Sequence, residues 1–153
     1  MMYYTHIAFG LLSSSVYIDF FSVENRVIFL LAALFFSLFP DIDETRSKIS
    51  GKSKLASKAI SFIFGHRGFF HTIYIPLLLF LILALLNIKV IIGTAVLVGY
   101  LSHLFLDALT PAGIRPFYPL YNKRINGFIK TNSISEKIFF VIVVVLDIYL
   151  VLE

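Results

Sequence analysis

The sequence contains no cysteine among its 153 residues. Disulfide bonds and thiolate–metal sites are therefore excluded, and a metal ion must be held by histidine, carboxylate, main-chain or water ligands. Charge is also scarce, because charged residues make up 14% of the chain, whereas soluble domains average about 25%. This shortage of charge argues against an ordinary soluble domain.

Several familiar catalytic motifs are missing as well. The chain has no His-Glu-x-x-His of a zinc protease and no glycine-rich Walker loop. It also lacks the Ser-Gly-His of lipid phosphatases that use a histidine nucleophile. These familiar classes of enzyme are therefore excluded.

Apolar residues make up 59% of the chain and are concentrated in long blocks. Such blocks predict an all-α integral membrane helical bundle that forms a single domain over residues 1–153. No separate signal peptide is expected, since the N-terminus has neither a basic region nor a small-residue cleavage site. About five membrane-embedded helices are expected: Met1–Phe21, Val27–Phe39, Thr72–Leu86, Val90–Leu106 and Lys137–Leu152.

These blocks are short for membrane spans. Val27–Phe39 reaches only about 20 Å at 1.5 Å per residue, against a hydrocarbon core of about 30 Å. We therefore expect the helices to extend through their polar ends. Histidines and acids at those ends, which could bind a metal ion, would then lie at the membrane interface.

The order of the blocks brings the histidines and acids that could bind a metal ion to one membrane face. If the chain crosses at each block, all the histidines and several acids at helix ends emerge on the same side. Chance placement at alternating ends would rarely do this, so a site at one face is predicted. The residues concerned are His6, Asp41, Asp43, His66, His71, His103 and Asp107.

Basic residues predict which face this is. Of the 13 lysines and arginines, only Arg26 and Lys89 fall on the opposite side. Cytoplasmic loops are the ones enriched in Lys and Arg. The chain is therefore predicted to lie in the cell (inner) membrane with its site and N-terminus cytoplasmic and its C-terminus external. The basic loops suit anionic lipid, and no nucleic-acid partner is expected.

The pair His103 and Asp107 is four residues apart, so both side chains lie on one helix face. This spacing allows either a simple hydrogen bond or a two-point grip on a divalent metal. Pro40-Asp41-Ile42-Asp43 places two acids at a helix end, as a polar turn or as one ligand and one supporting acid. His66 and His71, five apart, suit a loop-to-helix junction.

Two further residues allow more than one interpretation. Arg67, between glycines 65 and 68, either clamps an anionic group such as phosphate or snorkels to lipid headgroups. Asp147 lies deep in the last block, where an acid is costly and a functional candidate. We expect it to face the bundle and pair with a hydroxyl or another helix, too deep for the metal-type site.

These motifs resemble the YdjM family of predicted membrane-bound metal-dependent hydrolases. The resemblance covers most of the chain in order, including Thr5-His6, His71-Thr72 and Gly99-Tyr100-Leu101-Ser102-His103. That family is distantly similar to zinc-dependent phospholipases C and related nucleases. The resemblance implies metal ligands at His6, Asp41, His66 or His71, His103 and Asp107. This chain departs from the family at Phe70, where a small polar residue is expected. It also has few histidines, which favours a site with one or two metal ions over a site with three.

The sequence therefore predicts a metal-dependent, phospholipase C-like hydrolase of a phosphoester in a membrane lipid or another membrane-associated substrate. Zinc is the expected cofactor, because its bound water reaches a pKa of about 7. Asp43 is expected to orient water or act as general base, and Arg67 to hold phosphate. The alternatives are a non-enzymatic protein that binds or transports divalent metal, and a bundle in which the cluster only joins helices.

Overall fold

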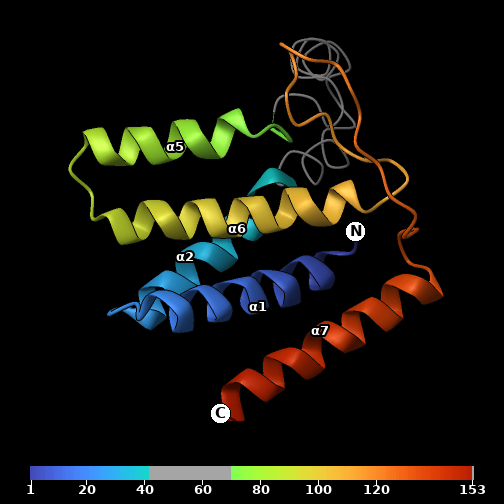
Figure 1. Ribbon diagram of the computed structural model, residues 1–153, viewed down its shortest axis with the longest axis horizontal. Coiled ribbons are helices and arrows are strands. Elements are labelled where there is room, and N and C mark those ends of the chain that lie inside the picture. Colours follow the sequence, from blue (N-terminus) through green and yellow to red (C-terminus); the bar gives the residue numbers. More distant parts are fainter. Residues whose placement is uncertain (42–69, 153) are drawn as a thin grey trace, which may run out of the picture.

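The computed structural model describes residues 1–41 and 70–152, and these ranges form five α-helices without a β-strand (Figure 1). The prediction of an all-α fold is confirmed for this part of the chain. The helices are α1 (Tyr3–Phe21), α2 (Arg26–Leu38), α5 (Tyr74–Leu85), α6 (Val90–Ala108) and α7 (Ile134–Leu152), and a short 3-10 turn, η1 (Phe39–Asp41), follows α2.

Tight turns make consecutive helices antiparallel. Helix α1 ends at Ser22, which adopts a left-handed conformation with φ 48° and reverses the chain into α2. Asn87, at φ 56°, does the same between α5 and α6. Helix α6 ends before Pro111, and the Thr110 hydroxyl donates to the Asp107 carbonyl at 2.8 Å. His103 and Asp107 therefore occupy the last turns of α6.

Helix α6 lies at the centre of the bundle and packs against α1, α2 and α5. The crossing with α2 is close, because a Cβ added to Gly99 would lie 2.0 Å from the Ala33 carbonyl oxygen. Only glycine permits this approach of two backbones. The hydroxyl of Tyr100, the next residue, donates to the Phe70 carbonyl at 2.6 Å. These contacts fix α6 relative to α2 and to the chain that enters α5.

Helix α7 packs on α1 and diverges from the other helices along its length (Figure 1). It starts beside α1, where buried Glu136 accepts hydrogen bonds from the Met2 amide at 2.7 Å and the Thr5 hydroxyl at 3.0 Å. The Asn132 amide also donates to this carboxylate. Glu136 therefore joins the beginnings of the two helices.

Several helix ends meet at one end of the bundle: the starts of α1, α5 and α7 and the end of α6, with η1 (Figure 1). By length and composition, α6 is the one described helix that could cross a membrane. Helix α5 is apolar but has only 12 residues. Asp43, His66 and Arg67 lie outside the described residues.

Candidate metal centre

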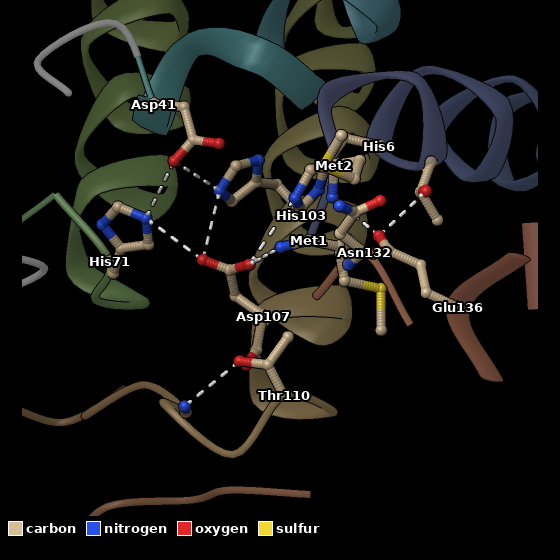
Figure 2. Close-up of polar contacts among 12 residues, drawn as sticks. Met1, Met2, His6, Asp41, His71, His103, Asp107, Thr110, Asn132 and Glu136 are labelled. Atoms are coloured by element: carbon tan, nitrogen blue, oxygen red, sulfur yellow. Dashed lines mark hydrogen bonds and ion pairs between the residues drawn. The ribbon is translucent and has the colours of Figure 1, made fainter. Parts of the chain in front are cut away.

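Four side chains from three parts of the fold converge at this end (Figure 2). Asp41 comes from η1, His71 from the residues just before α5, and His103 and Asp107 from the end of α6. Each offers one donor atom, and these atoms all lie within 4.8 Å of one another. His71, His103 and Asp107 are buried, whereas the Asp41 side chain is 28% exposed. The cluster is therefore enclosed except on the Asp41 side.

The spacing of the donor atoms is too long for hydrogen bonds. His71 Nε2 lies 3.6 Å from Asp41 Oδ1 and 3.5 Å from Asp107 Oδ2. His103 Nε2 lies 3.6 Å and 3.7 Å from the same two oxygens. Nitrogen–oxygen hydrogen bonds are about 2.7–3.2 Å long, whereas donors on a tetrahedral zinc ion with bonds of about 2.0–2.1 Å stand about 3.3 Å apart. The spacing fits a shared ion better than direct pairing.

The ring of His103 is held in the orientation that a metal ligand requires. Its Nδ1 lies 2.8 Å from the Ser37 carbonyl oxygen near the end of α2. Since a carbonyl can only accept, Nδ1 carries the proton and the lone pair of Nε2 points at the carboxylates. Metal-bound histidines commonly have their second nitrogen fixed in this way.

Three buried donor atoms that face one another in the cluster have no hydrogen-bond partner within residues 1–41 and 70–152: His71 Nε2, His103 Nε2 and Asp107 Oδ2. The other ring nitrogen of His71, Nδ1, also lacks one in these ranges. An unsatisfied buried polar atom costs about 1–3 kcal/mol, so three in contact require an explanation. One divalent cation would satisfy all three. Two imidazoles and two carboxylates form a donor set suited to zinc, and the residues present therefore fit the predicted metal.

The electrostatics of the cluster favour positive charge. Burial lowers the pKa of His71, but the carboxylates of Asp107 and Asp41 outweigh it and raise that pKa to about 9. Burial raises the pKa of Asp41, but contact with His71 and the charge of His103 outweigh it, and this pKa is lowered. The two acids thus stabilise a cation between them, whether a proton or a metal ion supplies it.

His6, which the resemblance implies as a ligand, lies beside the four donor atoms of the cluster. Its ring stacks on that of His103 with centroids 4.0 Å apart, and its Nε2 lies 3.5 Å from Asp107 Oδ1. The Met1 amino group donates to the same oxygen at 2.9 Å. Asp107 therefore directs its Oδ2 at the histidines of the cluster, and its Oδ1 faces His6 and Met1 (Figure 2). The predicted Asp43, His66 and Arg67 are outside the described residues.

The fold and the cluster define a helical protein with a candidate metal centre where its helix ends converge. The chain belongs to the YdjM family, since the family described as YdjM inner membrane protein matches residues 1–152. The predicted family is thereby confirmed, and this family consists of membrane proteins.

Individual relatives agree with this assignment. The chain is 33% identical over 135 residues to the uncharacterized protein YvsG of Bacillus subtilis (strain 168), covering 88% of this chain and 84% of YvsG. It is 38% identical over 96 residues to the inner membrane protein YdjM of Escherichia coli (strain K12), and equally to that of Shigella flexneri. These matches cover 58% of this chain and 47% of each YdjM. No solved structure matches.

Proposed function

We propose that this protein is a membrane-embedded, metal-dependent hydrolase that cleaves a phosphoester of a phospholipid or another membrane-associated substrate. The observation that carries the proposal is the buried cluster of Asp41, His71, His103 and Asp107, whose donor atoms fit one divalent ion. The similarity to phospholipases C suggested by the sequence motifs remains part of this proposal.

The cluster residues divide into fixed ligands and an open side. A bound zinc ion would supply a water of lowered pKa and polarise a phosphoryl oxygen. His103 and Asp107 are held rigidly by the Ser37 carbonyl and by the Met1 amino group. Asp41 is the more exposed member, so we propose that substrate and water reach the cluster past it. We further propose Asp43 as the base that orients water and Arg67 as the phosphate clamp.

We also propose that the described helices are embedded in the membrane with the cluster at its cytoplasmic face. Basic residues favour this orientation: Arg115 and Lys130 lie between α6 and α7, at the cluster end. At the opposite end, Arg26 begins α2 and Lys89 immediately precedes α6. Reporter fusions at residue 153 test the topology. An external reporter is expected, and a cytoplasmic one contradicts five crossings.

Hydrolysis is tested directly with purified protein in detergent. Headgroup release from a panel of phospholipids is measured with added zinc, for wild type, His103→Ala and Asp19→Asn. Asp19 lies at the far end of α1, is half exposed and faces Arg26 at 3.8 Å, so it controls for loss of a carboxylate elsewhere. We expect release with wild type and Asp19→Asn, and loss with His103→Ala. Release that is unchanged in His103→Ala contradicts the proposal.

A metal transporter is the main rival, and it requires a polar path from the cluster to the other face. Asp147 and Asp19 are the acids that could mark one. Asp147 lies between α1 and α7, away from the interior formed by α1, α2 and α6, and Asp19 is half exposed. Zinc flux into proteoliposomes that is lost in Asp147→Asn would favour transport over hydrolysis.

A further inference from the structure

An apolar groove runs between α1 and α7, away from the metal cluster. Its volume is about 510 Å³, within the range of about 300–1,000 Å³ usual for ligand sites. Ala8 and Leu11 line it from α1, and Val144 and Ile148 from α7. The α7 wall extends from Phe140 to Leu152, which is about 18 Å at 1.5 Å per residue. The groove is therefore apolar and elongated along α7, and it suits a hydrocarbon chain.

One carboxylate interrupts this apolar lining. Asp147 lines the groove and is 8% exposed. Its Oδ1 is buried and has no hydrogen-bond partner in the part of the chain that the structure describes. A leucine would suit a purely structural wall better, because a buried oxygen without a partner is unfavourable. The position of Asp147 indicates a ligand that brings a hydrogen-bond donor into the groove.

The membrane supplies ligands of this chemistry. The chain belongs to a family of inner membrane proteins, and α7 exposes apolar side chains beside the groove, among them Val141 and Val145. Hydrocarbon chains that contact this outer face can pass into the groove without crossing a polar surface. The groove is thus continuous with the surface that faces lipid in a membrane-embedded chain.

We propose that the α1–α7 groove binds the hydrocarbon chain of a lipid alcohol, whose hydroxyl donates a hydrogen bond to Asp147. This assigns Asp147 a role that the metal cluster leaves open. The proposal rests on the membrane location of the chain and not on hydrolysis. Its test therefore reads binding without turnover and is separate from the headgroup-release experiment.

Fluorescence provides the test, since the chain contains no tryptophan. Ile148→Trp places one reporter in the groove lining, and Val145→Trp places a matched reporter on α7 outside that lining, since Val145 is 58% exposed and Ile148 55%. Each variant is titrated in detergent micelles with dibrominated stearyl alcohol, whose bromines quench tryptophan. We expect saturable quenching for Ile148→Trp and a linear dependence on mole fraction for Val145→Trp. Equal linear quenching in both overturns the proposal.

Two further arms test the chain site and the hydroxyl separately. Ala8→Phe fills the groove from α1, and we expect it to abolish saturable quenching in the Ile148→Trp background, with Val144→Phe as an independent blocker from α7. The methyl ether of the probe lacks the donor and should bind at least about fivefold more weakly. In Asp147→Leu this difference should disappear. Saturable binding that survives both blockers, or equal binding of alcohol and ether to the Ile148→Trp protein, contradicts the proposal. The circular dichroism spectrum and a single size-exclusion peak report that each variant has folded.

Discussion

Helices α6 and α7 each have 19 residues and one buried aspartate, yet their aspartates lie in opposite surroundings. Helix α6 packs against three helices, and Asp107 faces three histidines and the Met1 amino group. Helix α7 packs on α1, and Asp147 faces an apolar groove. The same residue type therefore belongs to a candidate metal centre in one helix and lines an apolar groove in the other.

The difference arises from where each aspartate lies along its helix. Asp107 is in the last turn of α6, where η1 and the start of α5 bring Asp41 and His71 beside it. Asp147 lies about 20 Å along α7 from Ile134, at 1.5 Å per residue, in a groove that α1 lines on the other side. The candidate metal centre therefore arises from the convergence of helix ends more than from the residue composition of the helices.

The largest effect is expected where the comparison is sharpest. Asp107→Asn removes a carboxylate from the cluster, and we expect zinc affinity to fall more than about 100-fold, because even partners outside the ligand set contribute about 10–100-fold. Asp147→Asn, the same change in α7, should leave affinity unchanged. Calorimetric zinc titration measures both variants. Equal losses in the two would remove the distinction between the helices.

Chelation of the metal should also destabilise the wild-type protein. A ligand present at 100 times its dissociation constant stabilises the folded state by about 2.7 kcal/mol. Thermal unfolding in detergent, with and without zinc, is expected to show this shift in wild type and in Asp147→Asn. No shift is expected in Asp107→Asn, and a full zinc response in that variant would place the metal elsewhere.

Glu136→Ala should weaken the junction between α1 and α7. Its carboxylate accepts from Met2, Thr5 and Asn132, and the variant leaves these donors without it. Since an unsatisfied buried donor costs about 1–3 kcal/mol, we expect a loss of about 2–3 kcal/mol in thermal unfolding. Glu136→Gln keeps acceptor capacity and should lose less. Similar losses in both variants would point to the negative charge instead.

Gly99→Ala tests the packing that holds α6 in place. The added methyl group would meet the Ala33 backbone, which cannot give way without moving α2. Overpacking of this kind costs about 1–3 kcal/mol. At Gly93, the methyl group would meet only the Phe80 ring at 2.8 Å, and a side chain can rotate. Gly93→Ala should therefore unfold at a higher temperature than Gly99→Ala, and the reverse order would contradict the described crossing.

Asp147→Leu should have the smallest effect and the opposite sign. It removes a buried oxygen that has no partner among residues 1–41 and 70–152. Without added lipid alcohol we expect a gain of about 1 kcal/mol, measured by thermal unfolding in detergent. A clear loss would show that Asp147 has a structural partner.

Much of the fold could be predicted from the sequence, because long apolar blocks separated by polar turns leave few alternatives. The five predicted blocks correspond to α1, α2, α5, α6 and α7. The start of α7 was placed at Lys137, whereas the helix begins at Ile134. The polar residues there, including Glu136, do not indicate a helix start, because this start depends on tertiary contacts with Met2 and Thr5.

The candidate site could be predicted only in outline. Helical spacing pairs His103 with Asp107, and the antiparallel order of the helices brings Asp41 and His71 to the same end. Sequence cannot show that the Ser37 carbonyl fixes the His103 ring, because every residue has a carbonyl. Nor could it show that His6 faces the second oxygen of Asp107. Asp147 is predicted to pair with a hydroxyl or another helix, but its Oδ1 has no hydrogen-bond partner among residues 1–41 and 70–152.

The most direct test of the metal centre is the metal content of the purified protein. Elemental analysis after growth with zinc should find at least one transition-metal ion per chain in wild type and in Asp19→Asn. His103→Ala should contain almost none, because it removes the ligand that the Ser37 carbonyl orients. Wild-type protein free of transition metal, or His103→Ala with a full complement, would contradict the account.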